Sequence, residues 1–220
     1  MAFKEIYFSE DKINLQTEEM VRELLTDHSP VRKWNADLPH SALLVTDMQN
    51  YFTDPSSHAY IPSVRAVIPQ ILSLIRTFKD LKLPVLYTRH VNTPSDAGSM
   101  SRWWNDLIPG TSEKADTCKE LQGLADDTIT KTQYDAFYKT DLDGILISRG
   151  VKSLVITGVM TNLCCETTLR SAFVMGYNAI LPVDATATYN QSLHMSTFRN
   201  LVFGFCPLMT TSQVIEIMKS

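Results

Sequence analysis

From residue 41 onwards, short apolar runs alternate with longer segments that carry apolar residues at helical spacing. Of all features of this sequence, this alternation most constrains the fold. Several of the short runs carry apolar residues on both faces, which is typical of parallel strands covered on both sides. Strand and helix alternating in this order predict an α/β fold: a doubly wound, mostly parallel six-stranded sheet with helices on both faces and right-handed crossovers.

The expected elements follow from these runs. Strands are predicted at Ala42–Thr46, Pro84–Thr88, Thr128–Thr130, Ser153–Thr157, Asn178–Val183 and Pro207–Thr210. Helices are predicted at Val64–Leu81, Asp141–Arg149, Asn162–Met175, Ser192–Val202 and Gln213–Met218. Pro69 interrupts the first helical pattern, so that helix either begins near Pro69 or is kinked there. An amphipathic stretch from Thr17, acidic in its first turn, predicts a further helix on the outside of the domain.

A chain of 220 residues suits one domain with a substantial core. We therefore expect a single domain over 1–220, in which residues 1–35 form a peripheral N-terminal segment. The stretch 90–121 is the longest without clear periodicity and is rich in Ser, Pro, Asp and Gly. Loops of this length in compact domains are often binding loops or lids.

Charge and hydropathy limit the classes of partner. A net charge of −4 and a pI near 5.7 argue against nucleic acid, because binding a phosphate backbone needs clustered Lys and Arg. No stretch approaches the roughly 20 apolar residues of a spanning helix, and the start has no apolar core of signal-peptide length. We expect a cytoplasmic protein without a membrane partner. Glycine-rich nucleotide-binding turns and a Gly-x-Ser-x-Gly elbow are also absent from the sequence.

Three reactive side chains follow predicted strands. Asp47 and Lys131 come directly after two of the runs, and Cys164 lies a few residues beyond a third, at the start of a helix. Ligands of doubly wound folds bind outside the carboxyl ends of the strands, so these positions are candidates for a site. A helix N-terminus and a lysine would lower the pKa of a thiol there, and an aspartate could move its proton.

Each of these residues also has an ordinary structural interpretation. An Asp after a strand is often a turn former, a single Lys is usually solvated, and a free Cys is often simply buried. The chain holds four cysteines, and adjacent Cys164 and Cys165 suit neither a disulfide framework nor a Cys-x-x-Cys metal site.

Four sequence blocks connect the three candidates. In order and spacing they resemble the motif blocks of the isochorismatase-like cysteine hydrolase superfamily, over residues 41 to about 210. The resemblance implies that family's fold, with Asp47 as catalytic aspartate, Lys131 as catalytic lysine and Cys164 as nucleophile. The most specific part is Gly-Val-x-Thr-Asn-x-Cys, which ends at Cys164. The blocks are LLVTDMQNYF (43–52), LPVLYTRH (83–90), KTQYDAFYKTDLDGIL (131–146) and LVITGVMTNLCCETTLRSAFVMGYNAILPVDATATYN (154–190).

The same resemblance implies further features. A cis peptide is expected between Val159 and Met160, and the backbone N–H groups of Met160 and Cys164 would form an oxyanion hole. Cys165 stands where such proteins usually have valine, which indicates a buried neighbour. Relatives form dimers or tetramers, so a homodimer or homotetramer is expected. No cofactor is needed. The Asp-x-His and His cluster with which nicotinamidases bind a metal is missing around RHVNTPSDAG, so neither His90, His58 nor His194 is expected to hold a metal.

Candidate substrate-binding residues are aromatic, cationic or amide side chains close to these blocks. Aromatic rings supply apolar contact area, arginine can pair with a carboxylate, and an amide can orient the aspartate. Each has an alternative role in packing, a surface ion pair or a turn. The candidates are Gln49, Phe52, Arg89, Trp103, Trp104, Tyr134 and Phe137.

The preferred interpretation is hydrolysis of a small-molecule amide or carbamoyl-type C–N bond through a Cys164 thioester, with Asp47 as proton shuttle and Lys131 as electrostatic partner. An alternative is isochorismatase activity, in which Asp47 protonates a vinyl ether without a covalent intermediate. Enzymes of that type tend to have glycine at the nucleophile position, whereas this chain has cysteine. A third possibility, from another class, is a non-catalytic binding or assembly protein on the same scaffold.

Overall fold

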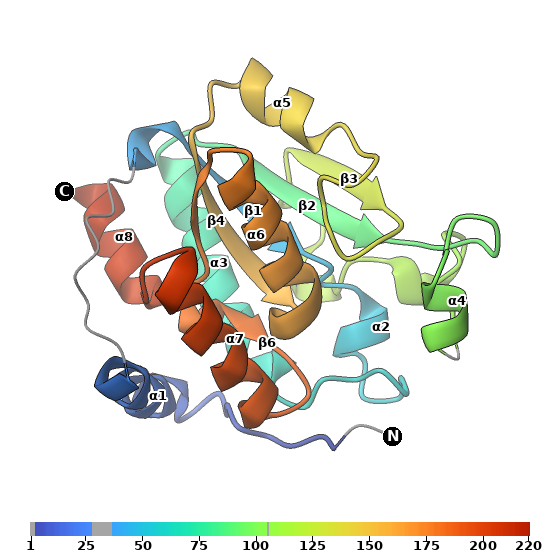
Figure 1. The fold of residues 1–220 in the computed structure, drawn as a ribbon, viewed down its shortest axis with the longest axis horizontal. Coiled ribbons are helices and arrows are strands. Elements are labelled where there is room, and N and C mark those ends of the chain that lie inside the picture. Colours follow the sequence, from blue (N-terminus) through green and yellow to red (C-terminus); the bar gives the residue numbers. More distant parts are fainter. Residues whose placement is uncertain (1–2, 28–36, 105) are drawn as a thin grey trace.

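The computed structural model describes residues 3–27, 37–104 and 106–220, and in this part of the chain the strands and helices alternate as the sequence predicts (Figure 1). The strands are β1 Ser41–Thr46, β2 Val85–His90, β3 Asp127–Lys131, β4 Ser153–Val159, β5 Asn178–Ile180 and β6 Thr186–Ala187. The helices are α1 Ile13–Asp27, α2 Asn50–Thr53, α3 Val64–Asp80, α4 Met100–Trp103, α5 Leu142–Ser148, α6 Glu166–Val174, α7 Gln191–Gly204 and α8 Thr211–Lys219.

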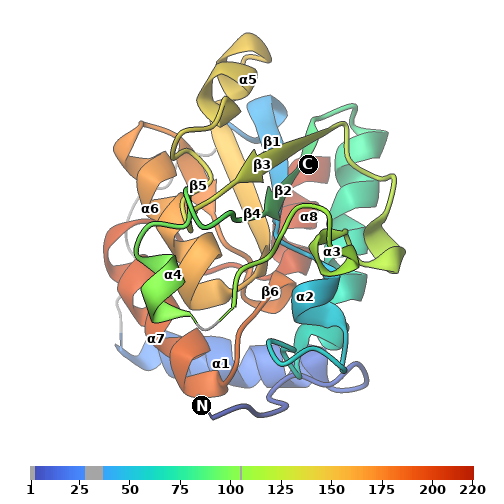
Figure 2. The ribbon, with the colours of Figure 1, turned by 90° about the vertical axis from the view of Figure 1, so that its right-hand side faces the viewer.

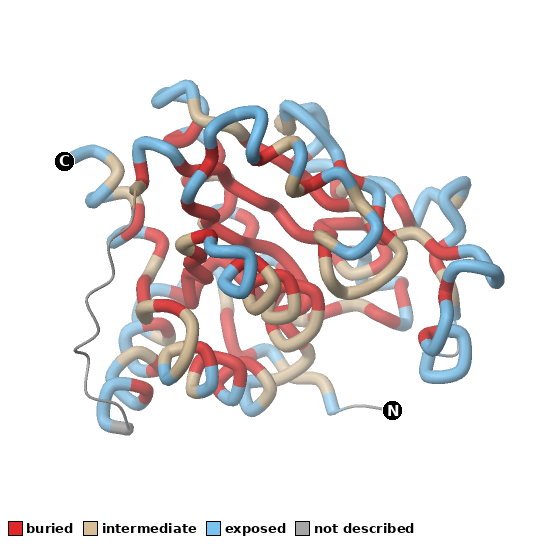
Figure 3. Tube along the Cα trace, turned by 45° about the horizontal axis from the view of Figure 1, so that its top comes forward, coloured by how far each residue is buried: buried red, intermediate tan, exposed pale blue. Residues whose placement is uncertain are grey.

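All strand pairs of the sheet are parallel, in the order β3-β2-β1-β4-β5, with β6 pairing to the end of β4. Helices α3 and α8 cover one face, and α6 and α7 cover the other (Figures 1 and 2). Strands β1 and β4 are buried along their whole length, which explains why their sequences are apolar without alternation. Figure 3 shows the central strands as the buried interior of the molecule. The doubly wound six-stranded prediction is therefore confirmed.

Two details differ from the prediction. The sixth strand is Thr186–Ala187, whereas the expected strand Pro207–Thr210 makes only an isolated bridge between Pro182 and Met209. Pro207 and the short length of this run leave little backbone to pair. Helix α3 begins at Val64 and continues through Pro69, so Pro69 does not start it. Pro69 is the sixth residue of α3 and is exposed.

The N-terminal segment, expected to be peripheral over 1–35, packs against the rest of the domain with several buried side chains where it is described; residues 1–2 and 28–35 lie outside the described residues. Tyr7 and Phe8 are buried, and Leu24 of α1 is fully buried in the main hydrophobic core. Helix α1 begins at Ile13, four residues before the predicted start at Thr17, and it packs on α7. Among the described residues, no helix has the length and apolar character needed to cross a membrane.

Candidate functional site

The carboxyl ends of neighbouring strands bring the three predicted residues together. Asp47 follows the last residue of β1 with a left-handed φ of 48°, and Lys131 is the last residue of β3. Cys164 lies in a π-helical turn, Thr161–Cys165, between β4 and α6. Since β2 separates β1 from β3 in the sheet, the Lys131 side chain must reach past the end of β2, where its register partner is His90.

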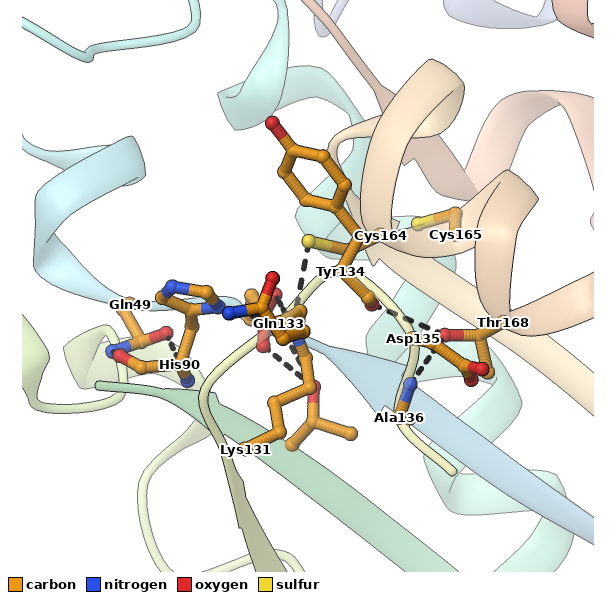
Figure 4. Close-up of polar contacts among 12 residues, drawn as sticks. Gln49, His90, Lys131, Gln133, Tyr134, Asp135, Ala136, Cys164, Cys165 and Thr168 are labelled. Atoms are coloured by element: carbon orange, nitrogen blue, oxygen red, sulfur yellow. Dashed lines mark hydrogen bonds and ion pairs between the residues drawn. The ribbon is translucent and has the colours of Figure 1, made fainter. Parts of the chain in front are cut away.

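The Lys131 ammonium is the centre of the cluster. Its Nζ lies 2.7 Å from Asp47 Oδ2 and 3.4 Å from the Cys164 sulfur, and it donates to the Gln133 carbonyl at 2.9 Å. Thr88 Oγ1 donates to the other Asp47 oxygen at 2.6 Å. Figure 4 shows the Cys164 sulfur turned toward Lys131, whereas the Cys165 sulfur has the Thr157 carbonyl as its partner at 3.8 Å. Lysine and aspartate are each no more than 1% exposed, so their charges compensate each other inside the protein.

His90, the last residue of β2, completes this arrangement. Asn92 Nδ2 donates to the Thr132 carbonyl, so its Oδ1 is left to accept from His90 Nε2 at 2.7 Å. The proton of a neutral His90 therefore resides on Nε2. Nδ1 then faces Lys131 Nζ at 3.3 Å as an acceptor. Burial and the neighbouring ammonium lower the pKa of His90, which favours this neutral form.

Electrostatics set the protonation states of the pair and the thiol. Burial alone would raise the pKa of Asp47, but Lys131 and the Thr88 hydrogen bond reverse this and hold the pKa below its usual value. Burial would lower the pKa of Lys131, yet Asp47 and Cys164 raise it. Both groups are therefore charged near neutral pH.

The pKa of Cys164 differs from the sequence prediction. Burial raises the pKa of this thiol to about 12, and the attraction of Lys131 is offset by the negative charge of Asp47. The expectation of a lowered pKa is therefore wrong, because the sulfur has lost its hydration and faces a carboxylate as well as an ammonium. The resting state is a thiol whose proton has an acceptor within reach: the sulfur and an Asp47 oxygen lie within 4.8 Å.

Asp47, His90 and Cys164 are also the cluster of potential metal ligands found among the described residues, with ligand atoms within 4.8 Å of one another. Lys131 Nζ contacts all three groups. A metal ion here would have to displace the ammonium or remove its proton, since two cations cannot share this space. The donor set thus fits a lysine-centred site better than a metal site.

The backbone beside Cys164 depends on Gly158 of β4. This glycine has a φ of +101°, and a Cβ on it would lie 2.1 Å from the carbonyl oxygen of Thr46, the residue before Asp47. The strands β1 and β4 can approach this closely only without a side chain. One residue further along, the peptide bond between Val159 and Met160 is cis. Met160 and Cys164, whose backbone N–H groups were expected to form an oxyanion hole, both line the cavity beside this turn.

A cavity of about 530 Å³ opens above the cluster. Cys164 and His90 contribute to its lining, and most of the remaining lining is apolar or aromatic. Of the predicted substrate-binding residues, Phe52, Trp104 and Tyr134 line it. Trp104 Nε1 donates to the Tyr134 hydroxyl at 2.7 Å, which ties the long loop to the segment after β3. A concave, mainly apolar site with reactive groups at one end suits a small organic substrate.

The other four predicted substrate-binding residues are not among the lining residues. Gln49 is buried and holds the backbone N–H and carbonyl of His90, so its amide is used structurally. Arg89 binds the carbonyls of Ala115 and Gly110. Trp103 is 78% exposed, and Phe137 stacks on Tyr177 outside the cavity. Each of the four directs its polar or aromatic group to other structural partners or to solvent.

Sequence reasoning missed several cavity residues. His90 was considered only as a metal ligand, although its position at the end of a strand beside the first one could have indicated the site. Lys4, Tyr189 and Asp106 also line the cavity. Lys4 lies outside the recognised blocks, and no pattern in the sequence connects it to them.

Comparisons with known proteins agree with this geometry. The family model of the isochorismatase domain matches residues 41–213. Nicotinamidase 3 of Arabidopsis thaliana is 38% identical over 183 residues, which make up 81% of this chain and 88% of that protein. A solved cysteine hydrolase from Pseudomonas syringae has a TM-score of 0.82 at 25% identity, covering 87% of this chain and 98% of its own. N-carbamoylsarcosine amidase from Thermoplasma acidophilum has a TM-score of 0.68 at 25% identity, covering 78% and 96%.

Proposed function

Since the chain belongs to the isochorismatase family and is a hydrolase, we propose that it cleaves a small amide or carbamoyl-type C–N bond through a thioester on Cys164. The observation that carries this proposal is the position of the Cys164 sulfur, at the cavity and within reach of both a carboxylate and an ammonium. A nucleophile, a proton acceptor and a fixed cation at one point are what acyl transfer requires.

In the first half of the reaction, Asp47 takes the proton of the Cys164 thiol as the sulfur attacks the substrate carbonyl carbon. The raised pKa of Cys164 means that proton transfer accompanies attack instead of preceding it. The C–N bond then breaks, and protonated Asp47 gives its proton to the departing nitrogen. The products of this half are an amine or ammonia and an acyl group bonded to sulfur.

In the second half, Asp47 is again a carboxylate and accepts a proton from a water molecule that attacks the thioester. The C–S bond breaks, the acid leaves, and the proton returns to sulfur. Lys131 stays charged beside both anionic groups throughout, which stabilises the carboxylate and thiolate states. The backbone N–H groups of Met160 and Cys164 are proposed to stabilise the negative oxygen of the tetrahedral intermediates.

The rival activities require different features. Vinyl ether cleavage by protonation from Asp47 would need that carboxyl to be protonated at working pH, whereas Lys131 and Thr88 hold its pKa low. It would also give the cysteine no role. A non-catalytic binding protein would have no use for a paired Asp and Lys beneath a thiol, since a buried ion pair contributes little net stability. The names of the relatives, a nicotinamidase and an amidase, also support C–N hydrolysis.

The test is an ammonia-release screen over small amides, ureido compounds and nicotinamide, with isochorismate assayed in parallel. We expect turnover of at least one C–N substrate, with loss in Cys164→Ala, and an acyl adduct on Cys164 detected by mass spectrometry after rapid quenching. Cys206→Ala, at a buried thiol that does not line the cavity, is the matched control. Full activity in Cys164→Ala would disprove the covalent route.

A further inference from the structure

The N-terminal strap, residues 3–9, lies outside the region matched by the family model and yet joins two loops at the cavity. On one side, Lys4 Nζ donates to the carbonyls of His58 and Tyr60 at 2.6 and 2.8 Å. On the other side, the Glu5 N–H donates to the Tyr189 carbonyl at 2.9 Å. The strap is therefore fixed between the loop after α2 and the loop before α7.

Further hydrogen bonds hold the strap against the buried interior of the domain. The N–H groups of Tyr7 and Phe8 both donate to the buried Ser63 hydroxyl, at 2.9 and 3.1 Å. The Tyr7 hydroxyl accepts from the Thr188 N–H at 2.9 Å. Because these atoms are buried, the backbone around Lys4 has little freedom, and its side chain is delivered to one place.

That place is the wall of the cavity, and the ammonium arrives there without a negative partner. Lys4 lies 4.3 Å from the centre of the Tyr189 ring, and both residues line the cavity. Within 3–27, 37–104 and 106–220, no carboxylate pairs with Lys4. Asp106, the acidic group in the lining, instead lies 3.7 Å from His58. Two neutral carbonyls and a ring face orient the cation but leave its charge unbalanced.

We propose that Lys4 is a substrate-binding residue that recognises a carboxylate, or a comparable anionic group, carried by the substrate away from the scissile C–N bond. Two of the three ammonium protons are directed to carbonyls, which leaves one donor for a ligand. The largely apolar lining makes an ion pair formed there stronger than one in open water. The substrate class is thus an amide or ureido compound that also bears an acid group. This proposal rests on the proposed C–N hydrolysis.

The test uses two amides of the same skeleton, benzamide and 3-carbamoylbenzoate, which differ by one carboxylate. Wild-type protein should have the lower KM for 3-carbamoylbenzoate. Lys4→Met should raise that KM about tenfold, the usual loss for one charge-assisted hydrogen bond, and leave the KM for benzamide within about twofold. Lys4→Arg should retain most of the preference. Lys79→Met, an exposed lysine at the end of α3, controls for the same change in net charge.

A structural role for Lys4 predicts a different pattern. If the side chain only anchors the strap, Lys4→Met will affect both amides equally and lower the melting temperature, and the proposal is overturned. Binding of both compounds to Cys164→Ala, measured by calorimetry, separates this question from turnover. Selective, Lys4-dependent binding of the carboxylate without any hydrolysis in wild-type protein would count against the proposed function alone. Equal binding of the two compounds would contradict the proposed recognition of a carboxylate by Lys4.

Discussion

The two ends of the cavity are built by different kinds of structure. The reactive end, formed by Asp47, Lys131 and Cys164, comes from strand ends and one tight turn, and its residues are at most 6% exposed. The loop wall, formed by residues 91–104 and 106–121, has one short α-helix and two 3-10 turns in these described ranges, and its Trp103 and Trp104 are 78% and 36% exposed. Chemistry needs fixed distances, whereas selection among substrates tolerates a surface that can vary. Substitutions at the reactive end should therefore affect kcat, and those at loop-wall residues that line the cavity should affect KM.

The largest effect is expected from Asp47→Asn. Asparagine keeps the shape but cannot accept the thiol proton, so kcat should fall about 10³-fold, the usual scale for losing a general acid–base group. It also leaves the Lys131 ammonium buried without its counter-ion, which should cost about 3–5 kcal/mol of unfolding free energy. Kinetics and urea unfolding measure the two effects. A variant that keeps more than a tenth of wild-type kcat would remove Asp47 from the mechanism.

Gly158→Ala tests whether the backbone beneath the reactive end is as tight as the distances indicate. The added methyl would lie 2.1 Å from the Thr46 carbonyl oxygen, and the φ of +101° is unfavourable for alanine. We expect a loss of about 3 kcal/mol or more of unfolding free energy, or failure to fold, because backbone on both sides would have to move. Gly123→Ala, at a positive φ with nothing within 4 Å of the new Cβ, isolates the effect of φ alone. Equal losses at both positions would contradict the close approach.

The pH dependence of the free energy of unfolding can be used to compare the reactive thiol, Cys164, with a thiol in the core, Cys206. Burial raises the pKa of Cys164 to about 12, against an ordinary value near 9, and Cys206 is raised similarly. Between these pH values the unfolded chain has lost the proton and the native protein retains it, so stability falls as pH rises. Each thiol contributes at most about 1.4 kcal/mol per pH unit to this slope.

Replacing Cys164 by alanine should therefore flatten the alkaline limb of urea unfolding measured from pH 8.5 to 10.5, as should Cys206→Ala. An unchanged slope in Cys164→Ala would mean that its pKa is not raised. We expect the two substitutions to have similar effects on the pH slope but different effects on activity. Only Cys164→Ala should abolish turnover, since Cys164, unlike Cys206, lies within reach of Asp47 and Lys131.

The sequence predicts the reactive end far better than the loop wall, for a physical reason. Mainly apolar runs without alternation mark β1 and β4, and residues directly after such runs must lie at one edge of a parallel sheet. The positions of Asp47, Lys131 and Cys164 therefore follow from local patterns and from the specific Gly-Val-x-Thr-Asn-x-Cys block. The sixth strand was misplaced because a two-residue strand has no pattern to recognise.

What could not be predicted depends on contacts between distant segments. Lys4 reaches the cavity through hydrogen bonds to residues more than 50 positions away, and Arg89 is held by carbonyls of the long loop. The raised pKa of Cys164 is also a tertiary property, since residue type and helix position say nothing about lost hydration. The sequence identifies aromatic loop residues as candidates for substrate binding, but tertiary packing decides which of these rings faces the cavity.

Trp104→Phe should give the smallest measurable effect and tests the loop wall directly. Phenylalanine keeps an aromatic face in the cavity but loses the hydrogen bond from Nε1 to the Tyr134 hydroxyl. A neutral hydrogen bond contributes about 1 kcal/mol, so KM should rise about fivefold while kcat stays within about twofold. Trp103→Ala, at the neighbouring exposed ring outside the lining, should leave both constants unchanged. If Trp104→Phe lowered kcat instead of raising KM, the loop wall would take part in the chemistry, and the division between the two ends of the cavity would be wrong.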